Sequence, residues 1–243
     1  MIKKPLIQFL KRKLSPLVSK VWENPFTQFT APEAMTRLAG HGFPVTTVVD
    51  IGASDGRWSR KAMPYFPAAR FLAIEPLAER SAALEQLRQE RPNFDFAIAA
   101  AGSGEKPEVR LNVSADLDGS TVDGSAGESR SVRSATLDEL LAERSLAGPY
   151  LIKFDTHGFE DEILRGARKT LEQTSVIVME VYNFKISPHA LRFPEMCQRL
   201  EALGFRCYDM ADPLLRLHDR CLWQMDFYFC RTDAKPFLHN DYR

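Results

Sequence analysis

The sequence lacks an excess of either charge, a paired-cysteine motif and a long apolar run. Its 32 Lys and Arg residues balance 32 Asp and Glu residues, so no overall field attracts a polyanion such as nucleic acid. The four cysteines are scattered without a CxxC pair, which indicates reduced thiols and excludes a disulfide framework or a zinc site. No apolar run approaches the roughly 18 to 20 residues that span a bilayer. We therefore expect a cytoplasmic protein that does not bind nucleic acid.

The first two dozen residues are basic, and their large apolar residues recur at near-helical spacing. Six lysine or arginine side chains are opposed there only by Glu23. Such a helix can lie on an anionic membrane surface, or it can pack on its own domain with its lysines in solvent. It is not a secretory signal, because charges interrupt the apolar residues and no small-residue cleavage site follows. We predict that residues 1–44 form a helical extension, partly basic and amphipathic, whose membrane contact is at most peripheral and at the inner face.

From residue 45 onward, strand-like and helix-like segments alternate. Apolar and β-branched runs predict strands, whereas runs rich in Ala, Leu, Glu and Arg predict helices. The expected strands are 46–51, 70–75, 94–100, 150–155, 175–181, 205–210 and 224–230, and the expected helices are 57–66, 77–90, 137–144, 159–171 and 194–203. This alternation implies right-handed βαβ crossovers. We predict an α/β domain at 45–232, Rossmann-like and doubly wound, whose mostly parallel sheet has seven strands and an antiparallel edge strand; 233–243 would be a C-terminal tail.

Residues 102–130 interrupt this alternation. They are rich in Gly, Ser, Asp and Glu and contain one strand-like island at 109–113. Segments of that composition run over domain surfaces, so we expect an excursion over the edge of the sheet. Its polar residues, among them Asp116, Asp118, Ser120 and Thr121, suit a cover over a carbohydrate substrate and equally suit a surface loop without a role.

A tight turn of small residues follows the first expected strand. The turn reads Asp50-Ile51-Gly52-Ala53-Ser54-Asp55-Gly56, and such residues let a backbone turn sharply and approach a ligand. A second acidic landmark, Glu75, ends the next strand and is followed by Pro76. A carboxylate at that place can accept hydrogen bonds from both hydroxyls of an adenosine ribose. Together these features predict a cofactor site formed by Asp50, Gly52, Ala53, Ser54, Gly56, Glu75 and Pro76.

The charge of this turn discriminates among nucleotide cofactors. A dinucleotide fingerprint reads GxGxxG and presents backbone amides to a pyrophosphate. This turn reads GxxxG and carries Asp50 and Asp55, whose charges oppose a diphosphate and suit the cationic sulfonium and ammonium groups of S-adenosylmethionine. We therefore predict S-adenosylmethionine as the cofactor, with an NAD-linked oxidoreductase as the disfavoured alternative.

Three blocks of the sequence resemble the FkbM family of methyltransferases. The first, Asp50-Ile51-Gly52-Ala53-x-x-Gly56-x-x-Ser59, is similar to that family's DIGAN-x-G-x-x-S signature and adds Ser59 to the candidate cofactor residues. The second, IKFDTHGFE at 152–160 with LRGA at 164–167, is similar to IKIDVEGxE followed by LxGA. The third, at 134–140, matches the family's T-L-D-x-L stretch. The resemblance extends over residues 45–230.

This resemblance implies a class I methyltransferase fold, S-adenosylmethionine as cofactor, and methyl transfer to oxygen, commonly a hydroxyl of a sugar or secondary metabolite. We accordingly expect a small-molecule or glycan acceptor. Two positions depart from the family pattern: Ser54 stands where Asn is usual, and His157 replaces the usual Glu of the second block. Because of His157, a catalytically inactive binding or scaffold protein with the same fold stays as the alternative function.

The candidate reaction centre follows the expected strands 150–155 and 175–181. Asp155 and His157 lie at the edge where open α/β sheets bind their ligands. Methyl transfer from a sulfonium to an alcohol is an in-line displacement, which needs alignment and removal of the hydroxyl proton. His157 is the candidate base because imidazole titrates near neutrality, and Asp155 would orient it or contact the substrate. Glu180 and Tyr182 are candidate substrate contacts.

A divalent metal ion is the alternative for this cluster. Asp155, His157 and Glu180 offer mixed nitrogen and oxygen ligands of the kind that divalent ions accept. The set is small and has no characteristic spacing, so we predict no metal. Glu160 is expected to be mainly structural, since it opposes the positive end of the helix that follows it.

Overall fold

The computed structural model describes residues 28–122 and 128–242 of the chain. The basic amphipathic helix predicted in the first two dozen residues lies outside the described residues. Within them, no helix is both long and apolar enough to cross a membrane.

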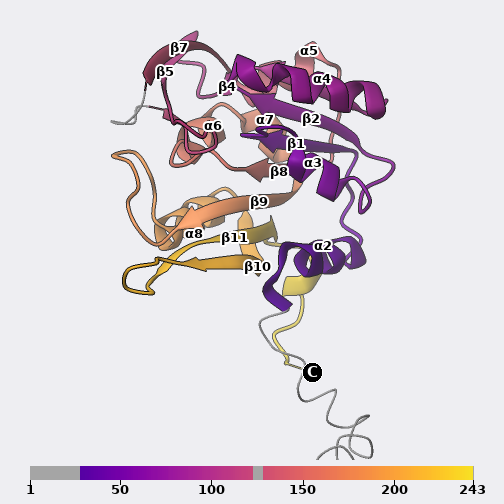
Figure 1. The fold of residues 1–243 in the computed structure, drawn as a ribbon. Coiled ribbons are helices and arrows are strands. Elements are labelled where there is room, and N and C mark those ends of the chain that lie inside the picture. The colour runs from indigo at the N-terminus through magenta and orange to yellow at the C-terminus, as the bar shows by residue number, and fades with distance from the viewer. Residues whose placement is uncertain (1–27, 123–127, 243) are drawn as a thin grey trace, which may run out of the picture.

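A seven-stranded mixed sheet forms the centre of the protein (Figure 1). Its strands, in spatial order, are β10 (Phe205–Leu215), β11 (Leu222–Arg231), β9 (Thr174–Tyr182), β8 (Tyr150–Phe154), β1 (Thr47–Ile51), β2 (Arg70–Glu75) and β3 (Phe94–Ile98). The run from β9 to β3 pairs in parallel, whereas β11 is antiparallel to both of its neighbours. The predicted α/β class and mostly parallel seven-stranded sheet are confirmed.

The edge strand β10 pairs antiparallel with β11, as expected, and β11 is the strand that runs against the rest of the sheet, one place inside the edge. The last two strands form a hairpin, and β11 is the member of this hairpin that pairs with β9. The outermost strand is therefore β10, which runs in the same direction as the parallel strands.

Helices cover both faces of this sheet. On one face lie α5 (Leu137–Glu143), α6 (Glu160–Arg165), α7 (Arg168–Glu172) and α8 (Phe193–Ala202), and on the other α2 (Ala31–Gly40), α3 (Arg57–Ala62) and α4 (Ser81–Glu90). The central strands are mostly apolar because both of their faces are buried. In β1, for example, Val49 belongs to the first apolar core and Val48 to the second.

Helix α2, within the predicted extension 1–44, packs against the body of the domain. Its buried side chains Ala34, Met35 and Leu38 join the core on the α3 and α4 face. The Arg37 guanidinium donates to both carboxylate oxygens of Asp209 in β10, at 2.7 and 2.9 Å. The C-terminal part of the predicted extension therefore packs on the large sheet and is bonded to its edge strand.

Residues 102–130 contain more regular structure than the sequence analysis predicted. Four strands, β4 (Ala100–Ala101), β5 (Glu108–Val113), β6 (Thr121–Val122) and β7 (Glu128–Ala135), form a second sheet in the order β4-β7-β5-β6. Figure 1 shows β5 and β7 at the upper left, outside the large sheet. Strand β7 reads ESRSVRSA and carries no apolar run, because most of its side chains are partly or fully exposed. That composition hid it from a search for apolar segments.

Three expected helices are shorter than predicted. The helix expected at 57–66 ends at Ala62, and the one expected at 77–90 begins at Ser81, after a short 3₁₀ helix at Ala78–Arg80. The one expected at 159–171 is divided into α6 and α7 at Gly166. A Cβ at Gly166 would lie 2.0 Å from the backbone oxygen of Gly102. The chain leading into the second sheet therefore runs directly against the break, which only a residue without a side chain permits.

Candidate active site

A single cavity collects most of the predicted site residues at the carboxyl ends of β1, β2, β8 and β9. It is lined by Asp50, Gly52, Ala53, Ser54, Glu75, Pro76, Asp155, His157 and Glu180. Gly56, Ser59 and Tyr182 do not line it. The structure thus brings together the β1 turn, the acid that ends β2 and the cluster beyond β8, as the parallel topology predicts.

Asp50 lines the cavity although it is only 1% exposed. Its Oδ2 accepts hydrogen bonds from the Ser59 hydroxyl at 2.7 Å and from the Ser59 backbone N–H at 3.2 Å. Burial raises the pKa of Asp50 to about 6, although these hydrogen bonds lower it. Ser59 therefore acts on the cavity through Asp50. Gly56 faces away from it, because a Cβ there would meet the side chain of Leu87 at 2.7 Å.

Glu75 presents a carboxylate held in place by backbone amides. Its Oε1 accepts from the Leu77 N–H at 2.9 Å and its Oε2 from the Ser54 N–H at 2.8 Å. Burial raises the pKa of Glu75 to about 7 against the lowering effect of these two bonds. Each oxygen keeps a further lone pair. The group can thus accept hydrogen bonds from two neighbouring ligand hydroxyls.

Asp155, His157 and Glu180 form a compact acid-base cluster on the opposite wall. His157 Nε2 lies 3.5 Å from Asp155 Oδ1 and 3.7 Å from Glu180 Oε1. Tyr182 donates its hydroxyl to Glu180 Oε1, and the Gln224 side-chain amide donates to Glu180 Oε2. Burial, with the charge of Asp155, raises the pKa of Glu180 to about 7. The imidazole therefore lies between two carboxyl groups of different acidity.

Lys153 is the buried cation beneath this cluster, and the sequence analysis gave it no role. Its side chain is 2% exposed, and its Nζ donates to Asp155 Oδ2 at 3.1 Å. Burial alone would lower the pKa of Lys153, but the charges of Asp155, Asp226, Asp50 and Glu180 outweigh it and raise the pKa. In return, Lys153 and His157 hold the pKa of Asp155 below its usual value although burial opposes them.

The turn after β8 fixes the position of His157. Glu160, buried at the start of α6, accepts hydrogen bonds from the Thr156 hydroxyl and the Gly158 N–H, both at 3.0 Å. His157 has a left-handed backbone with φ 53° and is followed by Gly158 with φ 102°. Such a conformation is rare outside glycine and is kept when the surroundings impose it. Glu160 thus shapes the turn that carries His157.

The cluster also has the chemistry of a cation site. The donor atoms of Asp155, His157 and Glu180 lie within 4.8 Å of one another, and in the described part of the chain they are the one such group of three. However, each carboxylate already accepts from fixed protein donors, Lys153 on one side and Tyr182 with Gln224 on the other. The absence of a metal stays a prediction, tested below by chelation.

The cavity has further walls that the sequence analysis did not assign to the cofactor. Leu77, Leu111, Leu117 and Val122 line one end and belong to a small apolar cluster between β2 and the second sheet. Arg57, Arg80 and Asp118 line it as well. From the sequence, Asp118 was predicted only to belong to a loop that either covers a substrate or has no role. The apolar residues were hidden because they are spread over a stretch of mixed composition.

The polarity of the cavity changes along its length in a way that fits S-adenosylmethionine. The apolar end suits a flat adenine ring, and Glu75 beside it suits the two ribose hydroxyls. The opposite end is lined by Asp50, Asp155 and Glu180, whose negative charge suits a sulfonium and an ammonium group. A diphosphate at that end would face three acids. The residues present therefore fit this cofactor and oppose a dinucleotide.

The chain is similar to known methyltransferases. Residues 50–207, more than half of the chain, match the family described as "Methyltransferase FkbM domain". No curated protein matches the chain. Among solved structures, the chain is similar to a methyltransferase FkbM from Methylobacillus flagellatus KT, with 16% identity and a TM-score of 0.48. That match covers 75% of this chain and 43% of the other, so this chain spans less than half the length of the Methylobacillus protein.

Two other methyltransferase structures are also similar to this chain. One is the 1,6-didemethyltoxoflavin-N1-methyltransferase of Burkholderia thailandensis with bound 1,6-didemethyltoxoflavin and S-adenosylhomocysteine, with 15% identity, a TM-score of 0.47 and coverage of 93% of this chain and 90% of that one. The other is the precorrin-6y C5,15-methyltransferase of Geobacter metallireducens GS-15, with 13% identity, a TM-score of 0.43 and coverage of 82% and 87%.

Proposed function

Because this chain belongs to the FkbM family of methyltransferases, we propose that it methylates a hydroxyl of a small acceptor with S-adenosylmethionine as cofactor. The acceptor class is a sugar, a glycan or a secondary metabolite. The proposal is supported by the mostly parallel seven-stranded sheet, which places the site at the carboxyl ends of its strands. In our proposal this fold is a Rossmann-like, doubly wound domain of the class I methyltransferase type.

The observation that carries the proposal is the pairing of two different acidic walls in one cavity. Glu75, with both oxygens fixed by backbone amides, provides acceptors for a ribose. Across the cavity, Asp155, His157 and Glu180 provide a base and two acceptors for a hydroxylated substrate. A cofactor site and an acid-base site that share one cavity are what group transfer to a hydroxyl requires.

When bound, S-adenosylmethionine supplies an electrophilic methyl group. The protein's own part is to hold the acceptor hydroxyl in line and to take up its proton. In our proposal the imidazole of His157 accepts that proton at Nδ1, while Nε2–H faces Asp155 Oδ1 and Glu180 Oε1 at 3.5 and 3.7 Å. The two carboxylates stabilise the imidazolium that forms, and Lys153 keeps Asp155 ionised.

The acidic wall also favours a polyhydroxylated acceptor. Carboxylates accept hydrogen bonds from hydroxyl groups and offer no donor of their own when ionised. Glu180, with a pKa of about 7, exchanges between an acceptor and a donor near neutral pH. A sugar ring presents several hydroxyls on one side and can engage Glu180 and Asp155 together. Nucleic acid as acceptor is disfavoured because these acids would face its phosphates.

A calorimetric titration tests the proposal. The purified full chain should bind S-adenosylmethionine and S-adenosylhomocysteine with micromolar affinity and should not bind NAD, and Glu75→Ala should lose the binding. A panel of sugars and phenols with methyl-labelled cofactor then identifies the acceptor. Absence of binding by the wild-type chain would overturn the proposal. Binding with no methyl transfer to any acceptor would favour a scaffold role.

A further inference from the structure

We propose that residues 114–120, the loop between β5 and β6, are a latched cover of the cofactor cavity. In this proposal the carboxylate of Asp118 is the latch, and the side chain of Leu117 closes the adenine end. The inference rests on the proposed function, because it takes the ligand of this cavity to be an adenosine derivative. It assigns a role to the second sheet and its loop, neither of which is needed to form the cofactor contacts of the β1 turn and Glu75.

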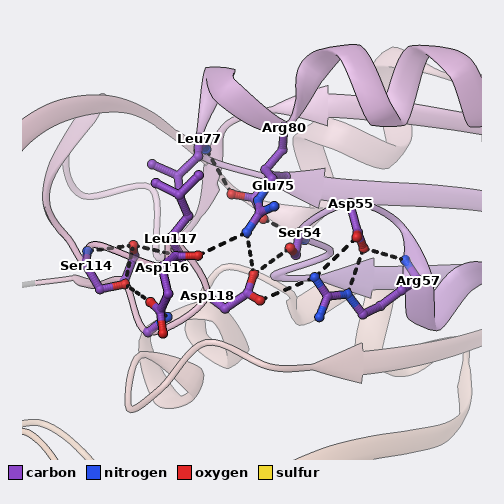
Figure 2. Close-up of polar contacts among 12 residues, drawn as sticks. Ser54, Asp55, Arg57, Glu75, Leu77, Arg80, Ser114, Asp116, Leu117 and Asp118 are labelled. Carbon is purple, nitrogen blue, oxygen red and sulfur yellow. Dashed lines mark hydrogen bonds and ion pairs between the residues drawn. The ribbon is translucent and has the colours of Figure 1, made fainter.

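Asp118 connects the loop to three side chains of the main domain, as Figure 2 shows. Its Oδ1 accepts from the Ser54 hydroxyl at 2.7 Å and from the Arg80 guanidinium at 2.6 Å. Its Oδ2 lies 3.3 Å from the Arg57 guanidinium, which also pairs with Asp55. Ser54 lies in the β1 turn, Arg57 begins α3 and Arg80 follows β2. One carboxylate thus binds side chains from the β1 turn, the start of α3 and the segment after β2, all of which line the cavity.

The other polar groups of the loop are used within the loop. The Ser114 hydroxyl and the Gly119 N–H donate to Asp116 Oδ1, at 2.6 and 3.2 Å. The Ser120 hydroxyl donates to the backbone oxygen of Leu117 at 2.7 Å. Among the described residues, the one further polar contact of the loop with the main domain is a long bond of 3.4 Å from Arg80 to the Asp116 backbone oxygen. The polar attachment of the loop therefore depends mainly on Asp118.

Leu117 is the apolar side chain of the loop that lines the cavity. Its backbone has a φ of 66°, a left-handed conformation that is costly for a branched apolar residue. The internal bonds of the loop hold that conformation, and the side chain lines the cavity and joins the cluster of Leu77 and Leu111. Figure 2 shows Leu117 beside Leu77. Side chains from the segment after β2, from β5 and from the loop thus line the end of the cavity that suits an adenine.

Opening this cover exposes the cofactor side of the cavity, so the latch sets how fast the cofactor leaves. The Asp118 and Arg57 side chains are 43% and 54% exposed, which places their ion pair under screening by salt. Exposed ion pairs stabilise weakly, and a carboxylate with three partners is worth about a three- to tenfold change in an equilibrium or rate. The latch is therefore strong enough to slow release and weak enough to allow turnover.

The first experiment measures the dissociation rate of S-adenosylhomocysteine by stopped-flow fluorescence, with Trp58 in the cavity wall as the reporter. Asp118→Ala should release the ligand about three- to tenfold faster than the wild type, and Asp118→Asn should fall between them because it keeps an acceptor. Asp219→Asn is the matched control, since Asp219 also pairs with an arginine in a surface loop but lies outside the cavity lining. Raising the salt concentration should speed release from the wild type more than from Asp118→Ala.

The second experiment needs no ligand. In the free protein, hydrogen exchange at residues 114–120 should be faster in Asp118→Ala than in the wild type, with unchanged exchange in β1 and β2.

A third experiment tests the apolar wall. Leu117→Ala should weaken the binding of adenosine and the binding of S-adenosylhomocysteine by the same factor. Unchanged release rates and unchanged exchange in the Asp118 variants would overturn the inference alone. A wild-type chain that binds neither ligand would overturn the proposed function together with it.

Discussion

Gly52 and Asp155 are in direct backbone contact, so closely that a Cβ built on Gly52 would lie 1.9 Å from the carbonyl oxygen of Asp155. Gly52 also has a φ of 74°. The β1 turn and the end of β8 therefore define each other's position, and the cofactor side of the cavity is fixed to the acid-base side at this point. The requirement for glycine here comes from the protein's own backbone as well as from any ligand.

Gly52→Ala should destabilise the protein by roughly 3 kcal/mol or more, because it adds both a left-handed alanine and a collision with backbone. Gly42→Ala is the control: Gly42 has a φ of 67°, and a Cβ there would meet nothing within 4 Å. The control should lose only about 1 kcal/mol, the cost of the conformation. Chemical denaturation measures both values. Equal losses in the two variants would show that the approach of Asp155 costs nothing.

Lys153→Met should destabilise the protein by about 3 kcal/mol, since it leaves the buried acids around Lys153 without their cation. It should also raise the pKa of Asp155, which Lys153 now lowers, and so move the acid limb of the activity profile to higher pH. Denaturation and a pH–rate profile measure the two effects. The exposed Lys61→Met is the control and should change neither. A variant with full stability and an unshifted profile would contradict the role of Lys153 in holding Asp155.

The sequence predicted the large sheet well because its strands are apolar on both faces. The runs around Val48 and Val49 or Leu151 and Ile152 are long enough to mark a buried parallel strand, and the acids that follow them mark its ligand edge. The β1 turn, Glu75, Asp155 and His157 were therefore predicted to lie together, and the cavity lining contains all four.

The second sheet could not be predicted in the same way. Its strand β7 is mostly polar, and β6 has two residues in the described part of the chain. Such strands form because of the segments they pair with and pack on. Strands β5 and β7 pair over six residues, and Leu111 and Val113 pack on Leu77, which lies in a distant part of the chain. The role of Lys153 could not be predicted either. The alternation along β8 shows which face of the sheet Lys153 lies on, but, apart from Asp155, the acids around it come from distant parts of the chain.

Cofactor affinity should depend on pH through Glu75, whose pKa is raised from 4.5 to about 7 by burial. Ribose hydroxyls donate to the ionised carboxylate, so binding releases a proton below pH 7, and affinity should rise with pH through 7 and level off above it. Below pH 7 the loss approaches about tenfold per pH unit. Asp50, with a pKa of about 6, acts in the same direction for a cationic ligand. Titrations with S-adenosylmethionine at pH 6, 7 and 8 measure this. Glu75→Gln should bind more weakly at pH 8 with a flatter dependence, and affinity that rises on acidification would contradict the assignment.

Chelation should leave methyl transfer unchanged, because Lys153 already balances the charge of Asp155, and Tyr182 and Gln224 already donate to Glu180. The measurement is the initial rate after treatment with EDTA and gel filtration, compared with the untreated protein and with added Mg²⁺ or Mn²⁺. A rate that is lost on chelation and restored by Mn²⁺ would instead assign Asp155, His157 and Glu180 as metal ligands.

Substitutions of His157 can separate a role of its imidazole as a base from a role of its left-handed backbone in the turn. His157→Asn keeps a short polar side chain that tolerates φ 53°, so it should fold with near wild-type stability and retain cofactor binding. Its rate of methyl transfer should fall by about 10² to 10⁴-fold, the usual contribution of a general base. His157→Gly relieves the conformation and should be equally inactive, so a loss shared by both variants belongs to the imidazole. If His157→Asn kept the wild-type rate at pH 7, the proton would have to leave through a carboxylate, and Glu180, with its pKa of about 7, would be the group to replace next.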